Sequence, residues 1–218
     1  PQRMVELLLS RVNAADPEQR RVAVYGLGLL LESRFGLSSY VASRAALLQA
    51  LKAPDPALRQ RAAEAFGRFR PAHLQQGSAS PVMGLEEVAG TLAALTEDGD
   101  PKVRTASLVS ISSFARLGKE DGVQSAPLQP TALAMIGRKR LGDSSPSVRI
   151  AALELLRAIP SDRLPAQIRG EIYNDVLTRV ADSDPAVMTV ALQSLSGFDE
   201  DGFPDRRRRS EDLAGLVS

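Results

Sequence analysis

The chain has 218 residues, of which 44% are apolar, 24% are charged and 4% are aromatic. Its formal net charge of +1 gives no overall attraction to nucleic acid or anionic lipid, and the apolar share excludes a wholly disordered chain. The absence of cysteine excludes disulfide bonds, catalytic thiols and thiolate metal sites. The longest apolar run, residues 22–31 with its two glycines, is shorter than the roughly 18 residues that span a membrane, so we expect no membrane partner.

Five prolines divide the sequence into units of similar length. They are separated by 39, 45, 45 and 39 residues, and each follows an aspartate or a serine. These pairs are Asp16-Pro17, Asp55-Pro56, Asp100-Pro101, Ser145-Pro146 and Asp184-Pro185. Such a pair is typical of a helix start, because the side-chain oxygen accepts a backbone N–H and proline needs no donor at the first helical position. The sequence therefore predicts five helices that begin at these prolines.

Residue types also repeat at fixed offsets, counted here as residues after each proline. Offset six is small, and offsets ten and thirteen are apolar, so that the three positions share one helical face. The residues at offset six are Ala23, Ala62, Ser107, Ala152 and Ala191, and those at offset ten are Leu27, Phe66, Ile111, Leu156 and Leu195. Those at offset thirteen are Leu30, Phe69, Phe114, Ile159 and Phe198. Apolar-periodic segments also precede the prolines, at residues 4–12, 40–52, 85–96, 131–141 and 168–181, so each unit is predicted to be helix, tight turn, helix.

Residues 100–106, Asp-Pro-Lys-Val-Arg-Thr-Ala, and 145–152, Ser-Pro-Ser-Val-Arg-Ile-Ala-Ala, resemble the second-helix signature of HEAT repeats. The resemblance extends over about residues 4–198 and implies an all-α, armadillo-like fold, a right-handed α-solenoid of about five HEAT-like helix pairs. We predict a single solenoid over residues 1–198, with repeats at about 1–32, 39–69, 85–117, 130–159 and 164–198. Residues 70–84 and 118–129 are expected to be longer connections. Residues 199–218 are predicted to form a charged linker and the start of a sixth repeat.

The sequence begins in a helical pattern directly after Pro1, without a signal segment. We therefore expect a fragment or a processed product, with neighbouring repeats missing from it.

The same resemblance implies a ladder of arginines. Offset three holds Arg20, Arg59, Arg104 and Arg149, followed by Met188 in the fifth unit. In HEAT repeats such an arginine typically pairs with an acidic residue in the turn of an adjacent repeat. The expected partners are Asp98, Asp143 and Asp182, each three residues before its proline, with Asp98 and Asp143 expected for Arg104 and Arg149. Ala14 and Ala53 occupy this place in the first two units, so we expect an incomplete ladder.

Residues suited to catalysis or metal binding are sparse. His73 is the only histidine, so no second one can form a metal pair or a proton relay with it. Gly26-Leu27-Gly28 lies in a helical pattern and lacks the third glycine and the preceding strand of a phosphate-binding loop. Asp98-Gly99-Asp100 and Asp182-Ser183-Asp184 do not continue as calcium loops. We therefore predict no catalytic residue, no cofactor and no metal.

Solenoids usually bind with the surface that their second helices line. We call this the second-helix surface, and we expect offsets four and eight to face it. The candidate partner-binding residues are Arg21, Tyr25, Gln60, Glu64, Thr105, Val109, Ile150, Glu154 and Gln193. This mixed set lacks the row of lysines and arginines that follows a phosphate backbone, and the strongest basic run is Arg206–Arg209. The composition of the surface favours a protein partner, whose identity the sequence does not give.

The predicted function is a non-enzymatic protein-binding scaffold or adaptor in the cytoplasm or another soluble intracellular compartment, with the nucleus left open. Two main alternatives stay open. One is a protein similar to the HEAT-like phycobilin lyases or to phycobilisome-associated proteins, which share a Val-Arg-x-x-Ala-Ala pattern but tend to have shorter repeats. Such a lyase needs no cysteine of its own, because the target protein supplies the thiol. The other is a nucleic-acid-binding HEAT-like protein, against which the balanced charge and the absence of tryptophan count. A tubulin-binding array of the TOG type usually presents a tryptophan and basic turns, whereas the turns of this chain are acidic.

Overall fold

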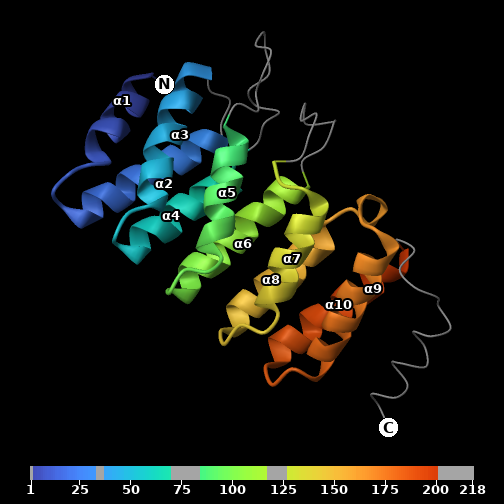
Figure 1. The fold of residues 1–218 in the computed structure, drawn as a ribbon. Coiled ribbons are helices and arrows are strands. Elements are labelled where there is room, and N and C mark those ends of the chain that lie inside the picture. Colours follow the sequence, from blue (N-terminus) through green and yellow to red (C-terminus); the bar gives the residue numbers. More distant parts are fainter. Residues whose placement is uncertain (1, 33–36, 70–83, 117–126, 201–218) are drawn as a thin grey trace. The chain divides into compact units, whose positions relative to one another are not determined.

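The computed structural model describes residues 2–32, 37–69, 84–116 and 127–200, and these ranges contain helices and no strand (Figure 1). The all-α prediction is therefore confirmed. The chain divides into two compact units, residues 1–128 and 129–218. Most of both long connections, His73, Arg206–Arg209 and the predicted sixth repeat lie outside the described residues. The single solenoid over residues 1–198 stays a prediction.

The first unit contains three helix pairs, and each second helix begins at its predicted proline. The pairs are α1 (Gln2–Arg11) with α2 (Pro17–Glu32), α3 (Leu37–Leu51) with α4 (Pro56–Gly67), and α5 (Leu85–Leu95) with α6 (Pro101–Ala115). Helix α4 packs against α2 on one side and against α6 on the other, as Figure 1 shows. The second helices of this unit therefore form one continuous layer.

The second unit contains two helix pairs built on the same plan. They are α7 (Pro130–Arg140) with α8 (Pro146–Ala158), and α9 (Ala166–Thr178) with α10 (Pro185–Glu200). Short 3₁₀ turns at Ser161–Arg163 and Arg179–Ala181 flank α9. Helix α8 packs against both α7 and α10, so the two second helices of this unit are also neighbours.

Aspartate side chains cap the second helices, as the sequence predicted. Asp16, Asp55, Asp100 and Asp184 each accept the N–H of the residue two positions further on, at 2.9, 3.0, 2.7 and 2.9 Å. The prediction is wrong for Ser145, whose hydroxyl makes no capping hydrogen bond. The first turn of α8 therefore lacks the side-chain cap that an aspartate provides at the other four predicted helix starts.

Small residues bring the second helices into close contact. The offset-six residues Ala62, Ser107, Ala152 and Ala191 are fully buried, and the offset-ten residues are buried as well. A Cβ atom added to Gly28 of α2 would lie 2.8 Å from the Cβ of Ala65 in α4. Larger side chains on this face would force neighbouring repeats apart.

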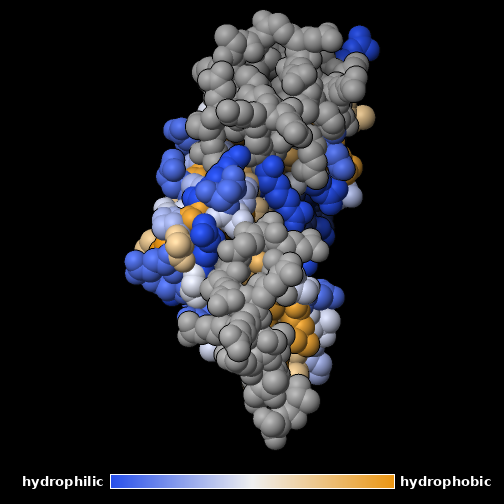
Figure 2. Space-filling model, turned by 90° about the vertical axis from the view of Figure 1, so that its right-hand side faces the viewer, coloured by the Kyte–Doolittle hydropathy of each residue, from blue (hydrophilic) through white to orange (hydrophobic). Residues whose placement is uncertain are grey.

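Polar residues cover much of the described surface on the face that Figure 2 shows. Figure 2 shows hydrophilic residues in blue with smaller, separate hydrophobic areas among them. Within the described ranges, no helix combines the length and the apolar character that crossing a bilayer requires.

Candidate partner-binding surface

The turns between helices are held together by arginines at offset three. Arg59 donates from Nε and Nη2 to the two carboxylate oxygens of Asp98 in the following repeat, both at 2.8 Å. Its Nη1 donates to the carbonyls of Ala53 and Pro54 in its own turn, at 2.8 and 2.9 Å. One guanidinium therefore ties two successive turns of the first unit together.

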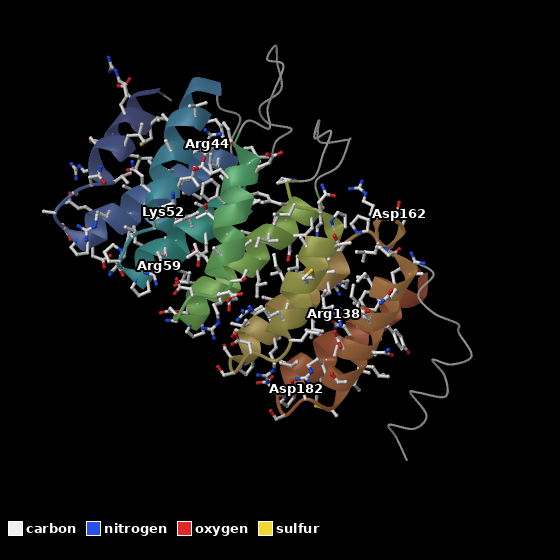
Figure 3. All side chains as sticks on the ribbon, in the orientation of Figure 1. Arg44, Lys52, Arg59, Arg138, Asp162 and Asp182 are labelled. Carbon is white, nitrogen blue, oxygen red and sulfur yellow. The ribbon has the colours of Figure 1, made fainter. Side chains whose placement is uncertain are left out.

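Arg149 makes the same contacts in the second unit. Its Nε and Nη2 donate to the carboxylate of Asp182 at 2.9 and 2.6 Å, and its Nη1 donates to the carbonyl of Asp143 at 2.8 Å. The carboxylate that Arg149 binds is thus Asp182, one repeat further on than Asp143, which contributes its backbone. The hydrogen bonds from Arg149 lower the pKa of Asp182 in spite of its burial. Figure 3 labels Asp182 in this turn.

The first repeat departs from this pattern. The Nη1 of Arg20 donates to the carbonyls of Ala14 and Ala15 at 2.6 and 2.9 Å. Ala53 stands where the next turn would supply a carboxylate, so Arg21 makes the inter-repeat contact, with Nε and Nη2 3.2 and 3.1 Å from Oδ2 of Asp55. The structure therefore places Arg21, a candidate partner-binding residue, in an ion pair between repeats.

Arg104 resembles Arg20 in its backbone contacts. Its Nη1 donates to the carbonyl of Asp98 at 2.9 Å and to that of Gly99 at 3.2 Å. The expected Asp98 is therefore contacted through its backbone, while the carboxylate of that residue binds Arg59.

The second-helix surface of the first unit carries five other candidate residues. Tyr25 of α2 and Val109 of α6 are 43% and 51% exposed. Gln60 and Glu64 of α4 are half-buried, and the amide of Gln60 donates to Glu64 at 2.7 Å. The Thr105 hydroxyl donates to a carbonyl of its own helix. The structure thus brings an exposed aromatic ring, an exposed aliphatic side chain and a polar pair onto adjacent helices.

Two arginines that sequence reasoning missed lie beside Tyr25. The guanidinium carbon of Arg68 is 5.3 Å from the centroid of the Tyr25 ring, and that of Arg61 is 6.0 Å from it. At these distances a guanidinium is attracted to the aromatic ring. Arg61 and Arg68 stand at offsets five and twelve of α4, and their seven-residue spacing was the available signal that they share a helix side.

In the second unit, the remaining candidates lie on α8 and α10. Ile150 and Glu154 are half-buried, and Gln193 is exposed. Arg157 donates to Glu154 at 2.9 Å within α8. This surface has no aromatic residue among its candidates.

A second feature of this unit was not predicted from the sequence. Arg138 of α7 donates from Nε to Asp175 of α9 at 2.5 Å and also pairs with Glu171. The first helices are therefore joined by ion pairs of their own, and Figure 3 labels Arg138.

A groove of about 670 Å³ opens between α3 and α5 on the first-helix side of the first unit. Gly90 and Ala94 of α5 line it together with Leu51, Lys52 and Arg59, and Figure 3 labels Lys52 and Arg59. Sequence reasoning did not find it. Among the described residues, no group of three or more His, Asp or Glu side chains is placed to hold a metal ion.

Comparisons with known proteins find that the chain is similar to repeat proteins in sequence and in structure. The family model of HEAT repeats matches residues 5–112. No curated protein matches the sequence. A designed armadillo repeat protein in complex with the peptide (KR)4 is 16% identical, with a TM-score of 0.64, over 90% of this chain and 84% of that one. An engineered protein is 17% identical, with a TM-score of 0.63, over 91% of this chain and 81% of that one.

A third similar structure is the complex of CpcE and CpcF of phycocyanin lyase from Nostoc sp. PCC7120. The similar chain in that structure is 19% identical, with a TM-score of 0.55, over 89% of this chain and 99% of that one. At such identities, these three similarities show the fold alone.

Proposed function

The chain belongs to the HEAT-repeat family through residues 5–112, and on that premise we propose that it is a non-enzymatic scaffold that binds a protein partner on its second-helix surface. The observation that carries the proposal is the exposure of Tyr25 and Val109 on helices that flank α4 in one layer. Tyrosine and arginine dominate the binding energy of many protein interfaces. Tyr25 with its two neighbouring arginines supplies that combination.

Two further observations support a binding role. The arginines at offset three all hydrogen-bond groups in the turns, which supports a structural role for them, while the exposed groups of the second-helix surface remain accessible. A designed armadillo repeat protein of the same fold is in complex with a peptide, which supports the view that such a layer of helices accommodates an extended chain.

A matched pair of valine substitutions tests this proposal. Val109 lies on the second-helix surface and Val41 on the first helix α3, and they are 51% and 45% exposed. Peptides selected from a random phage-displayed library on the unmodified protein serve as probes. Val109→Asp should weaken their binding at least tenfold, because a charge would be buried at the interface, whereas Val41→Asp should leave it unchanged. The proposal would be contradicted if both variants weakened peptide binding equally, or if neither variant weakened it.

A lyase-like activity is the second candidate, favoured by the structural similarity to the CpcE and CpcF complex. Its test is incubation of the chain with a linear tetrapyrrole and a phycobiliprotein subunit. Acceleration of chromophore attachment by the chain would replace the scaffold proposal with a lyase-like one. We expect no acceleration, because the second-helix surface offers no pair of nucleophile and base among its described residues.

Nucleic-acid binding is tested separately with generic duplex DNA. The candidate residues of the second-helix surface include one arginine, Arg21, and the side chain of Arg21 is already paired with Asp55. We therefore expect weak binding at physiological salt, which falls steeply as salt rises. Tight binding that persists at high salt would contradict the protein-partner proposal.

A further inference from the structure

One cluster on the second-helix surface indicates which kind of partner would bind there. It consists of Tyr25, Arg61 and Arg68. The ring of Tyr25 is 43% exposed, and the side chains of Arg61 and Arg68 are 47% and 36% exposed. Arg61 lies on α4 and Arg68, seven residues further on, is its C-cap residue, so that their backbones are separated by about 10 Å along the helix axis. The ring projects from the neighbouring helix α2 and lies within 6.0 Å of both guanidinium carbons.

Both guanidinium groups keep hydrogen-bond donors available to a partner. Arg61 uses one nitrogen, Nη1, in a 3.0 Å contact with Glu64. Arg68 is 4.0 Å from Glu32, too far for a hydrogen bond. A guanidinium has five N–H donors, and a planar group held against an aromatic ring still presents its edge to a carboxylate. The cluster therefore presents two guanidinium groups to a partner, together with the apolar face of the Tyr25 ring.

From this geometry, and resting on the proposed function, we infer that the cluster binds an extended acidic peptide segment with carboxylates at positions i and i+3. In a polyproline II segment, residues i and i+3 lie on the same side and about 9 Å apart, which is close to the backbone separation of Arg61 and Arg68 along the axis of α4. An apolar residue between the two carboxylates would then face Tyr25 and Val22, and Val22 is 63% exposed one turn earlier on α2.

Glu64 makes the inference sharper, because it competes with the partner for Arg61. A carboxylate arriving at Arg61 has to share the guanidinium with Glu64 or displace it. Removal of the Glu64 charge should therefore strengthen the binding of an acidic peptide. A site selective for basic peptides would respond in the opposite direction.

The experiment uses fluorescence anisotropy with the full chain and labelled peptides built on the motif Glu-Pro-Leu-Glu. The acidic peptide should bind, and its Gln-Pro-Leu-Gln counterpart should bind at least about tenfold more weakly, because two charge-assisted hydrogen bonds are lost. Arg61→Gln and Arg68→Gln should each weaken the acidic peptide about threefold to fivefold, and Glu64→Gln should tighten it. Rising salt should weaken it as well.

A matched control lies on α8. Arg157 pairs with Glu154 at 2.9 Å, three residues apart, as Arg61 pairs with Glu64, and the exposures of the two pairs are similar. Arg157→Gln should leave peptide binding unchanged. Thermal melts of all four variants verify that these substitutions leave the fold intact.

Each remaining outcome decides against the inference. Equal binding of the acidic and neutral peptides, preference for the basic peptide (KR)4, or tighter binding of a phosphoserine version would each overturn the assignment to carboxylates. The library selection with Val109→Asp is independent of these peptides. If it succeeds with peptides that carry no acidic pair, the proposed function stands and the inference falls.

Discussion

Two turns of the first unit use an arginine at the same offset in different ways. After α3, Arg59 binds both carboxylate oxygens of Asp98 in the next repeat. After α1, Arg20 contacts carbonyls of its own turn, and its neighbour Arg21 crosses to Asp55. The difference lies in the following turn at the position three residues before its proline, which is Asp98, 39 residues after Arg59, but Ala53, 33 residues after Arg20. The role of a ladder residue is thus decided by its partner in the following repeat.

The largest effect is expected where such a pair is most buried. The side chains of Arg149 and Asp182 are 9% and 4% exposed. Asp182→Ala should lower the free energy of unfolding by about 3 kcal/mol, because it leaves a buried guanidinium without its counter-ion. Urea denaturation measures this loss.

The half-exposed pair of the first repeat is the control for that measurement. Arg21 and Asp55 are 33% and 25% exposed. Arg21→Gln should cost less than about 1 kcal/mol, since solvent screens such pairs. Equal losses in Asp182→Ala and Arg21→Gln would show that burial does not separate the two kinds of turn.

Packing at offset six should produce the next largest effect. Ala152 of α8 is fully buried, whereas Ala45 of α3 is exposed. Ala152→Leu should destabilise the protein by about 1–3 kcal/mol through overpacking, and Ala45→Leu should change stability by less than about 0.5 kcal/mol. If both variants melt like the parent, the helical register assigned to α8 is wrong.

Substitutions at the helix caps Asp100 and Ser145 should also differ in their effect on stability. The carboxylate of Asp100 accepts the N–H of Lys102 at 2.7 Å, while the hydroxyl of Ser145 makes no capping bond. Asp100→Ala should cost about 1 kcal/mol and Ser145→Ala only a few tenths, as thermal unfolding would measure. A comparable loss at Ser145 would show that its hydroxyl caps α8 in solution.

Acid should weaken the ladder through Asp182. The hydrogen bonds from Arg149 lower the pKa of Asp182 below its ordinary value of 3.8. A lowered pKa in the folded state contributes stability that is fully present above the unfolded pKa and is lost as pH falls through the folded one. Unfolding measured between about pH 6 and pH 2 should therefore show a smaller acid-induced loss for Asp182→Asn than for the parent. Identical pH profiles would contradict this role of the pair.

The sequence alone predicted the helix starts, because an aspartate before a proline acts within one turn of chain. It also predicted the buried stripe at offsets six, ten and thirteen, which depend only on the period of a helix, except that Leu30 at offset thirteen of the first unit is half-buried. The cluster of Arg61 and Arg68 at Tyr25 could not be predicted in this way. Its members lie on two helices, and the rotation and slide of one helix against the other are set by contacts such as Gly28 with Ala65, which periodicity within a helix does not specify.

The same limit explains Arg21. Offset four placed it on the partner-facing side, and Asp55 was predicted only as the cap of the helix that begins at Pro56. The structure shows that this carboxylate does both, since one oxygen accepts the N–H of Ala57 and the other lies 3.2 Å from Nε of Arg21. The sequence does not show that a capping aspartate also forms an ion pair with an arginine 34 residues earlier.

The smallest effect is expected from a substitution that would complete the arginine ladder in the first repeat. Ala53 occupies the position three residues before Pro56, where Asp98 and Asp182 stand before Pro101 and Pro185. Ala53→Asp would place a carboxylate opposite Arg20, whose Nη1 already holds it against its own turn. We expect a gain of about 0.5 kcal/mol, because the added pair is partly exposed and the arginine is already ordered. In an Arg20→Gln background the gain should vanish, as a double-mutant cycle measured by urea denaturation would show. A gain that survives in that background would mean that the carboxylate acts on another cation, such as Arg21, and that offset three alone does not define the ladder.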